Sequence, residues 1–457
     1  MRIAVVLAGA LVLGSSLGVA ALATGSAPSF ARARSFAVGS YPYSVAIGDL
    51  NGDDKPDLAT ANRAADTVSM LLNRGNGSFQ AKRDFRTGRG PNSVAIGDLN
   101  GDGNPDLATA GFAQDSVSVL LNRGDGSFQA WLDYATGDTP SSVAIGDLNG
   151  DEKPDLAITN RAADTVSVLL NRGDGSFEAT LDYTTGDGPY SVAIGDLNGD
   201  DKPDLAIANN HYKTVSVLVN RGDASFQAKH DYRAGDAPNS VAIGDLNGDE
   251  KPDLAIANGA ASSVSVLLNR GDGSFQAKHD FRTGHGPNSV AIGDLNGDRR
   301  PDLAIAYFLL PDANFYPDAG IVSVLANRGD GSFQARLDYR NRNGRRREQG
   351  SSWSVAIGDL NSDRKPDLAT ANYLEDGAVA VFLNTPGLCT VQDVRGQTLS
   401  AAKRTIARAN CRVGKIRRAY ARYIKRGRVI SEKPKPGTVL PNRGKVTLVV
   451  SLGRRPS

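Results

Sequence analysis

The nine residues Asp49–Asp57 read Asp-Leu-Asn-Gly-Asp-Asp-Lys-Pro-Asp, and variants of this phrase occur seven times along the chain. The first six copies start 49 residues apart and the last follows after 65, at Asp49, Asp98, Asp147, Asp196, Asp245, Asp294 and Asp359. In the last copy, Ser362 takes the place of the glycine. A fixed period of this length is typical of a repeat protein in which each unit is one supersecondary structure.

Each repeat unit has the pattern of four short strands. In the second unit we expect strands over residues 93–99, 106–110, 116–121 and 128–136, because small, apolar and β-branched residues fill these runs and turn residues separate them. Helical periodicity is missing from the repeats. Four antiparallel strands per unit, repeated seven times, predict an all-β fold, namely a seven-bladed β-propeller.

The two ends of the repeat region complement each other. The last unit stops after its third strand, near residues 383–384, and lacks a fourth. Residues 30–39 align with residues 79–88 at the 49-residue offset, so the chain begins with a strand of the fourth type. We expect this N-terminal strand to complete the last blade and close the ring, which removes the exposed sheet edges.

Three stretches carry a resemblance to a known family: Val-Ala-Ile-Gly-Asp-Leu-Asn-Gly-Asp, Pro-Asp-Leu-Ala and Leu-Leu-Asn-Arg-Gly-Asp-Gly-Ser-Phe. Over residues 30–385 the chain resembles the FG-GAP/VCBS repeat proteins, whose calcium-loop blades also occur in the heads of integrin alpha subunits. The resemblance implies a propeller over this range. It does not imply a single function, because the family serves adhesion, sugar binding and catalysis.

Each repeated phrase alternates oxygen-bearing side chains in the way that a hard cation requires. The predicted ligands are the side chains at positions 1, 3, 5 and 9 and the backbone carbonyl at position 7. In chain order these residues are Asp49, Asn51, Asp53, Lys55, Asp57; Asp98, Asn100, Asp102, Asn104, Asp106; Asp147, Asn149, Asp151, Lys153, Asp155; Asp196, Asn198, Asp200, Lys202, Asp204; Asp245, Asn247, Asp249, Lys251, Asp253; Asp294, Asn296, Asp298, Arg300, Asp302; and Asp359, Asn361, Asp363, Lys365, Asp367.

So many oxygen ligands on a turn favour calcium over magnesium, and we expect calcium to have a structural role. The alternative is that the phrases form Asx turns without a metal. Arg299 and Arg364, at position 6 of their loops, are expected to weaken those two sites.

The chain begins and ends with segments unlike the repeats. Residues 1–23 combine a basic start, an apolar run and Ala21-Leu22-Ala23, the pattern of a secretory signal peptide, with a membrane anchor as the alternative. Residues 387–457 hold 18 basic and 2 acidic residues, a net charge of +16, whereas the remainder holds 34 basic and 48 acidic residues, a net charge of −14. A basic secreted tail favours an acidic wall polymer over nucleic acid as its partner.

The tail also has a folded pattern. Apolar spacing predicts a helix over residues 400–409, and residues 445–451 have the composition of a strand. With the runs at 394–399, 429–431 and 434–438, these segments resemble one PASTA domain over residues 389–453, which implies a small α+β module associated with peptidoglycan.

Cys389 and Cys411 are the only cysteines, and they flank the predicted helix. In a secreted protein such a pair indicates a disulfide, which would stabilise the tail by about 3 kcal/mol. Two buried free thiols are the alternative.

The sixth unit carries 16 extra residues, divided between the loop joining its second and third strands and the loop to the next unit. In an up-and-down blade these loops share the face opposite the repeated phrases. We hypothesise a ligand-binding site there, formed by Tyr307, Phe308, Phe315, Tyr316, Arg345, Arg346, Arg347 and the nearby Trp353. A decorated loop without a ligand is the alternative. The five Arg-Gly-Asp tripeptides are interpreted as turns rather than recognition signals.

These observations favour a secreted or wall-associated, noncatalytic binding or adhesion protein. Its propeller would bind calcium and recognise a glycan or protein ligand, its tail would attach to peptidoglycan or another wall polymer, and no membrane insertion is expected after signal cleavage. The alternative is an extracellular polysaccharide lyase or hydrolase. The near-uniform blades disfavour an enzyme, because a catalytic centre needs unlike groups at fixed places.

Overall fold

The computed structural model describes residues 27–308, 321–340, 351–385, 388–440 and 444–455. The predicted signal peptide over residues 1–23 lies outside these ranges. Within them, no helix is long and apolar enough to cross a membrane.

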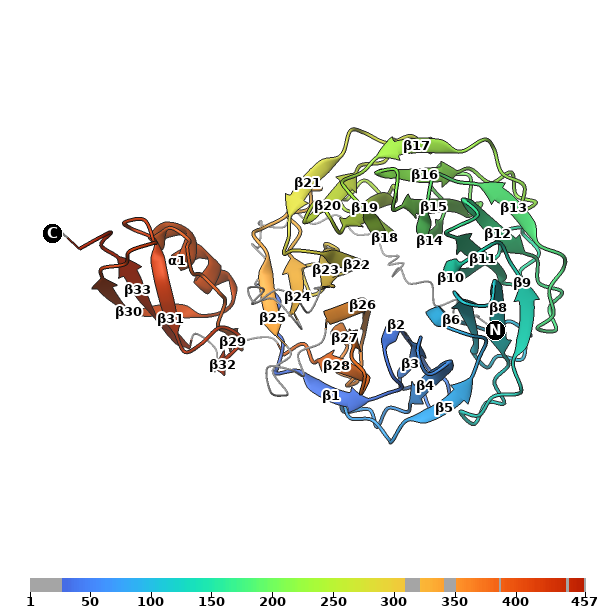
Figure 1. The fold of residues 1–457 in the computed structure, drawn as a ribbon, viewed down its shortest axis with the longest axis horizontal. Coiled ribbons are helices and arrows are strands. Elements are labelled where there is room, and N and C mark those ends of the chain that lie inside the picture. Colours follow the sequence, from blue (N-terminus) through green and yellow to red (C-terminus); the bar gives the residue numbers. More distant parts are fainter. Residues whose placement is uncertain (1–26, 309–320, 341–350, 386–387, 441–443, 456–457) are drawn as a thin grey trace, which may run out of the picture.

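Seven four-stranded antiparallel sheets are arranged as blades around a ring, as Figure 1 shows. The first strands lie nearest the centre: β2 (Pro42–Gly48), β6 (Pro91–Gly97), β10 (Pro140–Gly146), β14 (Pro189–Gly195), β18 (Pro238–Gly244), β22 (Pro287–Gly293) and β26 (Ser351–Gly358). The second strands are β3 (Asp57–Asn62), β7 (Asp106–Gly111), β11 (Asp155–Asn160), β15 (Asp204–Asn209), β19 (Asp253–Asn258), β23 (Asp302–Tyr307) and β27 (Asp367–Tyr373).

The third strands are β4 (Thr67–Leu71), β8 (Ser116–Leu120), β12 (Thr165–Leu169), β16 (Thr214–Leu218), β20 (Ser263–Leu267), β24 (Ile321–Leu325) and β28 (Ala378–Phe382). The outermost strands are β5 (Arg83–Arg86), β9 (Leu132–Ala135), β13 (Leu181–Thr184), β17 (His230–Arg233), β21 (His279–Arg282), β25 (Leu337–Arg340) and, for the last blade, β1 (Arg34–Ala37). The predicted seven-bladed propeller is confirmed.

The strand limits differ from the prediction mainly in the outermost strands. Strand β9 covers only Leu132–Ala135, whereas the sequence predicted a strand over residues 128–136. Phe128 instead forms an isolated bridge with Asn122 across the preceding turn. The apolar Phe128 is buried between blades, so its pattern resembled a strand although its backbone belongs to the turn.

The N-terminal strand closes the ring as predicted. Strand β1 pairs antiparallel with β28, placing Phe36 opposite Val379. The Phe36 ring also packs edge-on against Phe79 of the first blade, with 5.0 Å between centroids. One short strand therefore completes the last blade and contacts the first.

The core of the propeller lies between successive blades. The second strands are buried along their whole length, except for Tyr373 at the end of β27. Each blade shares an apolar cluster with the next, such as Ala59 and Met70 with Val94 and Leu107. Glycine at the end of each first strand permits this close packing. A Cβ at Gly48 would lie 3.0 Å from Cγ2 of Ile96 in the next blade.

The C-terminal segment forms a separate α+β domain. It contains β29 (Cys389–Thr390), α1 (Leu399–Arg408), β30 (Arg412–Ala419), β31 (Val429–Lys433), β32 (Val439–Leu440) and β33 (Lys445–Ser451). The Thr398 side chain caps the helix by accepting a hydrogen bond from the Ala401 amide. The observed helix begins one residue before the predicted start at residue 400. The strand over 445–451 has its predicted limits, and the predicted Cys389–Cys411 disulfide is present.

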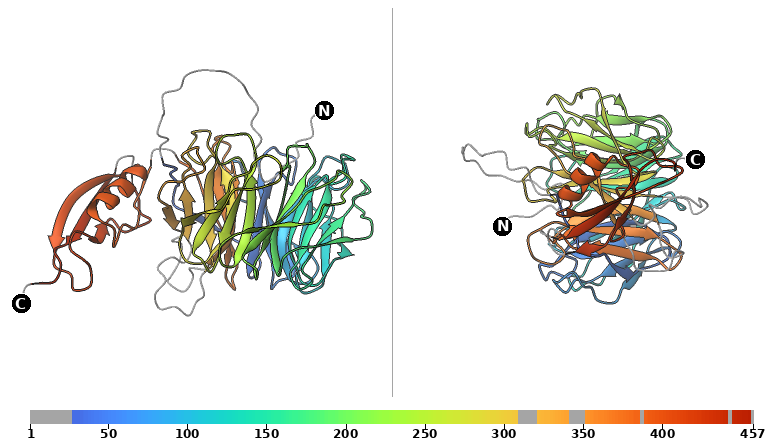
Figure 2. Two further views of the ribbon diagram at one scale, coloured as in Figure 1. Left: turned by 90° about the horizontal axis from the view of Figure 1, so that it is seen from above. Right: turned by 90° about the vertical axis from the view of Figure 1, so that its left-hand side faces the viewer.

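This domain packs against the sixth blade, as the views in Figures 1 and 2 agree. Leu337 and Tyr339 on β25 are each 2% exposed, whereas Leu132 at the position of Leu337 in the second blade is 49% exposed. The Gln392 side chain accepts a hydrogen bond of 2.7 Å from the Asp338 amide, and Arg340 lies 3.7 Å from the Asp393 carboxylate. A continuous apolar cluster joins the two domains through Phe30 and Tyr339. The sequence did not predict this contact.

Candidate functional site

The first repeated phrase shows how the Asp loops are built. Oδ1 of Asp49 accepts hydrogen bonds from the amides of Asn51 (3.3 Å) and Gly52 (2.8 Å), and Oδ2 accepts one from Asp54 (2.7 Å). Asn51 Oδ1 accepts a hydrogen bond of 3.1 Å from the Asp53 amide. These bonds fold the loop as a series of Asx turns. The side chains at positions 1 and 3 therefore fix the backbone of their own loop.

The carboxylate at position 9 is buried beneath its loop. Asp57 is 0% exposed, its Oδ2 accepts a hydrogen bond of 3.0 Å from the Leu50 amide, and its Oδ1 accepts one of 2.7 Å from the Asn73 amide. The same two bonds recur in every blade, at Asp106, Asp155, Asp204, Asp253, Asp302 and Asp367.

A side-chain amide links each Asp loop to that of the preceding blade. Asn122 donates from its backbone to Asp106 in its own blade (2.7 Å) and from Nδ2 to the Leu50 carbonyl one blade earlier (2.9 Å). The equivalent asparagines repeat this link: Asn73, Asn171, Asn220, Asn269, Asn327 and Asn384. Aspartate, leucine and asparagine thus alternate around the propeller in a continuous hydrogen-bonded ring.

Burial raises the pKa of each position-9 carboxyl. The pKa of Asp57 rises to about 7, with smaller contributions from the nearby charges of Asp53 and Asp49, while the two amide hydrogen bonds act in the opposite direction. The pKa rises to about 7 for Asp106 and Asp367, to about 6 for Asp155, Asp204 and Asp253, and to about 8 for Asp302. A nearby cation would relieve this cost by favouring the charged form.

The chemistry of each Asp loop fits a hard cation, because every predicted ligand supplies oxygen. In the described conformation, however, the carboxylates turn toward the loop amides, and no three acidic, His or Cys side chains of the described residues converge as metal ligands. Lys55 lies 2.8 Å from Asp53 and lowers its pKa although burial acts to raise it. A bound cation would therefore compete with this lysine for the position-5 carboxylate.

The Arg-Gly-Asp tripeptides form the turns that the sequence indicated. Asp174 accepts a hydrogen bond of 2.9 Å from the Ser176 amide, and Arg172 donates one of 2.8 Å to the Phe177 carbonyl. Both charged side chains of the tripeptide thus bond to their own turn.

The face opposite the Asp loops, which we call the insertion face, carries only part of the predicted ligand site. Phe315, Tyr316, Arg345, Arg346 and Arg347 lie outside the described residues. Tyr307 was assigned to this face wrongly. Its side chain is 1% exposed, and its hydroxyl accepts a hydrogen bond from the Gly284 amide, because the sixth residue of a second strand is buried.

Phe308 and Trp353 do lie together, in an aromatic cluster that spans the sixth, seventh and first blades. Their ring centroids are 4.3 Å apart. Trp353 also packs 4.1 Å from Tyr43 and 5.4 Å from Tyr373, and Tyr373 lies 4.7 Å from Tyr41. The sequence analysis missed Tyr41, Tyr43 and Tyr373. Comparison at the 49-residue offset would have found them, because other blades have small or polar residues at several of the equivalent positions.

Arg63 extends the aromatic cluster toward the second blade. Its guanidinium carbon lies 4.7 Å from the Tyr43 ring centroid and 4.1 Å from that of Phe112, and Nη1 donates a hydrogen bond of 2.6 Å to the Tyr43 hydroxyl. Burial raises the pKa of Tyr43 to about 12 although Arg63 acts to lower it, so this hydroxyl stays protonated at neutral pH. Beside Arg63 lies a cavity of about 390 Å³, lined by Tyr41, Arg63, Ala64, Asp66, Arg89, Gly90, Ala113 and Tyr373.

Family comparisons agree with this architecture. The FG-GAP-like repeat model matches residues 49–109, 99–158, 147–207, 196–256 and 245–305. The chain belongs to the FG-GAP-like repeat family. An FG-GAP repeat also matches residues 351–382, and a PASTA domain matches residues 390–452, which confirms the identity of the tail.

Solved structures resemble this FG-GAP repeat protein in fold. BBS1N, in its complex with ARL6DN, has 12% identity and a TM-score of 0.54 over 79% of this chain and 98% of its own. A lectin of Agrocybe aegerita, from a structure on recognition of non-reducing terminal N-acetylglucosamine, has 18% identity and a TM-score of 0.48 over 69% of this chain and 91% of its own. At 12% identity the likeness to BBS1N shows the fold alone.

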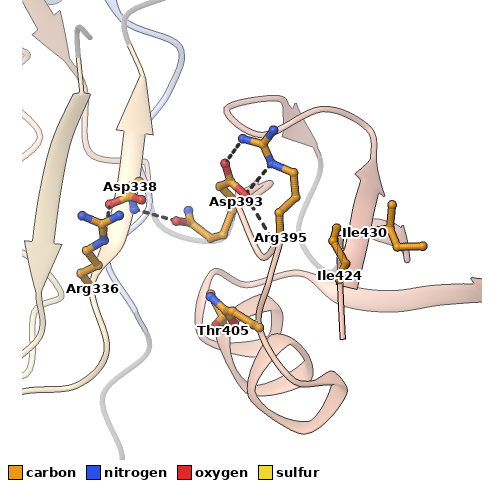
Figure 3. Close-up of a pocket in the computed structure, with 9 residues that line it drawn as sticks. Arg336, Asp338, Asp393, Arg395, Thr405, Ile424 and Ile430 are labelled. Carbon is orange, nitrogen blue, oxygen red and sulfur yellow. Dashed lines mark hydrogen bonds and ion pairs between the residues drawn. The ribbon is translucent and has the colours of Figure 1, made fainter. Parts of the chain in front are cut away.

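A second hollow of this FG-GAP repeat protein, of about 580 Å³, lies between the sixth blade and the PASTA domain (Figure 3). Arg336 and Asp338 border it from the propeller, and Asp393 and Arg395 border it from the PASTA domain. The charges pair across short distances, with 3.0 Å between Arg395 Nε and Asp393 Oδ1 and 3.4 Å between Arg336 Nε and Asp338 Oδ1. We interpret this hollow as part of the joint between the domains.

Proposed function

We propose that this protein is a noncatalytic binding protein of the bacterial cell envelope, with a ligand-recognising propeller and a PASTA domain that attaches it to the wall. A repeat propeller joined to a PASTA domain indicates an extracellular binding or wall-related protein. The finer assignment rests on one observation, the cationic surface of the PASTA domain.

This cationic surface is a continuous stretch of chain from β30 into the following loop. Its exposed basic residues are Arg412, Lys415, Arg417, Arg418, Arg422, Lys425, Arg426 and Arg428. None of the eight forms a salt bridge with a residue that the structure describes. Tyr423, which is 84% exposed, lies among them. Unpaired surface cations of this density attract an anionic polymer over a distance set by salt screening.

Binding of the full chain to purified Gram-positive cell walls tests this assignment. Changing Arg417, Arg418 and Arg422 to Gln should weaken wall binding at least tenfold, and added salt should weaken the wild type in the same way. The matched control changes Arg86, Arg233 and Arg282, three exposed arginines on outermost propeller strands, to Gln. Equal loss in both triple variants would reject the PASTA domain as the attachment site.

The proposal also expects no release of reducing sugar when the protein is incubated with the walls. Measurable release that depends on the insertion face would favour the lyase or hydrolase alternative.

We further propose that calcium binds the Asp loops and stabilises the ring. The proposal rests on their oxygen-only ligand sets and on the buried position-9 carboxyls. Bound calcium would supply positive charge at the loops, and ions that bind only the folded state stabilise it by mass action. EDTA should lower the melting temperature, and calcium should restore it more effectively than magnesium.

Metal analysis of two neighbouring variants would test this calcium assignment. Asp53→Asn alters a predicted ligand and should lower the bound calcium by about one ion per chain. Asp54→Asn changes an adjacent carboxyl that is not a predicted ligand, in a left-handed backbone conformation (φ 59°) that Asn tolerates. Equal calcium content in the two variants and the wild type would count against the site, as would an unchanged melting curve in EDTA.

A further inference from the structure

One departure from the sevenfold repeat on the insertion face lies at Tyr41. The backbone position of Tyr41 is left-handed in the first six blades, with φ of 53° at Tyr41 itself. Its equivalents are small or short: Gly90, Thr139, Gly188, Ala237 and Gly286. Bulky and β-branched residues are both strained in this conformation, so Tyr41 and Thr139 are strained alike, but only Tyr41 adds an aromatic ring.

The strained tyrosine borders the cavity of about 390 Å³, whose volume lies near the lower end of the range for small-molecule pockets. Tyr41 and Tyr373 are both half-buried, so each retains exposed ring surface. The Tyr41 backbone is held by hydrogen bonds to the Leu374 carbonyl (2.8 Å) and from the Arg63 amide (3.1 Å). The aromatic wall of the cavity is therefore fixed by the two neighbouring blades.

The polar wall of the cavity mixes hydrogen-bond donors and acceptors. Arg63 and Arg89 line the cavity, and neither forms a salt bridge with a residue that the structure describes. Asp66 supplies an exposed carboxylate, whose Oδ1 accepts a hydrogen bond of 2.8 Å from the Gly90 amide and whose Oδ2 forms no hydrogen bond with a residue that the structure describes. Donors and acceptors beside aromatic rings suit a sugar, because its hydroxyls do both and its C–H face is apolar.

We propose that this cavity binds one or two sugar units of a neutral glycan, with a sugar ring stacked on Tyr41 and Tyr373 and its hydroxyls bonded to Arg63, Arg89 and Asp66. The inference rests on the proposed function, since it names the ligand class of the propeller. Charge favours a neutral glycan over an acidic one. Residues 1–386 carry a net charge of −14, and Asp66 offsets one of the two arginines in the cavity.

A peptide bound as an extra β-strand fits less well, because amides of the innermost strands already donate hydrogen bonds to the neighbouring blade. The Val45 amide donates to the Ser354 hydroxyl (3.5 Å), and the Val94 amide donates to the Ser44 hydroxyl (3.3 Å). An equivalent bond joins each of the remaining pairs of neighbouring blades. These bonds occupy backbone groups that a peptide would need for pairing beside the innermost strands.

Tryptophan fluorescence offers a direct test. The chain has only two tryptophans, and Trp353 belongs to the aromatic cluster. In a full-length Trp131→Phe background, the signal therefore reports on Trp353 alone. The neutral probes are chitotetraose, cellotetraose and mannotetraose, the acidic probe is tetragalacturonate, and a proline-rich decapeptide represents ligands that dock on aromatic grooves. At least one neutral probe should give a saturable change with a Kd of about 1 mM or below.

Two glycine substitutions separate binding from folding. Tyr41→Gly introduces the residue found at this position in three other blades, so it should leave the melting temperature unchanged or raise it while weakening the neutral probe at least tenfold. Thr139→Gly makes the same backbone change in the third blade, away from the cavity, and should alter binding less than twofold. Asp66→Asn retains the acceptor for the Gly90 amide and should weaken binding severalfold.

Several results would overturn the inference. They are the absence of a saturable change with every neutral probe, equal losses in Tyr41→Gly and Thr139→Gly, or preferential binding of tetragalacturonate or of the peptide. Wall attachment through the PASTA domain is measured independently. If it persists while the neutral probes fail, only the assignment of this cavity is rejected.

Discussion

The side-chain amide of Asn73 donates a hydrogen bond of 2.9 Å to the Leu360 carbonyl, joining the first blade to the last across 287 residues. Leu360 is the second residue of the last Asp loop, and the Asn73 backbone amide donates to Asp57 in the first. The ring of blades is therefore closed by hydrogen bonds between buried groups as well as by the pairing of β1 with β28.

Replacing this link should destabilise the propeller substantially. Asn73→Ala removes the side-chain donor that bridges the buried Leu360 carbonyl and the Pro56 carbonyl, and leaves Leu360 bonded only to the Gly77 amide. We expect this loss to cost about 1–3 kcal/mol. Urea denaturation should show this loss, and Asn220→Ala should show a similar one, because Asn220 bonds to the Leu148 carbonyl in the same way. Asn76→Asp, in the exposed turn after Asn73, is the control and should cost under about 0.5 kcal/mol, because aspartate at the equivalent position of the second blade, Asp125, keeps the bond from the serine amide. A neutral Asn73→Ala would contradict the structural role of the ring.

The closing strand can be tested against its equivalent in an uninterrupted blade. Phe36→Ala removes the ring that packs on Phe79, and Phe85→Ala removes the equivalent ring that packs on Phe128. Both changes should cost about 2–4 kcal/mol. Strand β1 is connected by the chain to the first blade and is held in the last blade only by its pairing with β28. Phe36→Ala weakens this attachment, so only this variant should aggregate on size-exclusion chromatography. Equal aggregation of the two variants would contradict the special role of β1.

Glu432 should make the stability of the PASTA domain depend on pH. Burial raises its pKa to about 7, and the Asp393 charge adds to this effect while Arg395 and Arg340 oppose it. Because the folded-state pKa is raised, the stabilising contribution is complete below the unfolded pKa of about 4.3 and is lost as pH rises through 7. The loss should amount to about 2–3 kcal/mol between pH 5 and pH 8.

Glu432→Gln isolates this effect, because all other titrating groups remain. Denaturation measured at pH 5, 6, 7 and 8 should show that the difference between the variant and the wild type grows in favour of the variant as pH rises. A constant difference across this range would show that Glu432 does not titrate there.

The joint between the domains predicts a change in molecular shape. Leu337→Glu places a charge in the buried contact with the PASTA domain and should separate the two domains. Small-angle X-ray scattering should then give a larger radius of gyration. Leu132→Glu at the equivalent, exposed position of the second blade should leave the radius unchanged. If both variants keep the wild-type radius, the contact does not hold the domains together.

The fold was predictable because each blade repeats the same local signals. Small and β-branched residues, the Asp loop and the Gly-Asp-Gly turn recur with fixed spacing, so one unit could be checked against six others. The docking of the PASTA domain was not predictable in this way. Leu337 has the same residue type as Leu132 and Leu181, and only the surface brought against it by the folded chain makes it buried.

The candidate ligand site was predicted in part. Phe308 and Trp353 are on the insertion face as predicted. Side chains alternate in direction along β23, so Tyr307 points inward while the next residue, Phe308, points outward. The predicted site did not include Tyr41, because Tyr41 lies outside the insertions and its signal is a substitution at a position that is glycine in three other blades. Neither calcium occupancy nor ligand recognition follows from the repeat alone, and both stay predictions.

The pairing of β1 with β28 also sets an order of events during biosynthesis. Among the strands of the propeller, β1 leaves the ribosome first, yet its partner emerges only after six blades have been made. Joining them requires closure of a loop of nearly the whole propeller, whose entropic cost must be met late in folding. Until then the last blade has an open edge, which proteases and other chains can reach. A chain truncated before β28 would keep its first strand unpaired, so completion of the ring distinguishes full-length molecules from fragments.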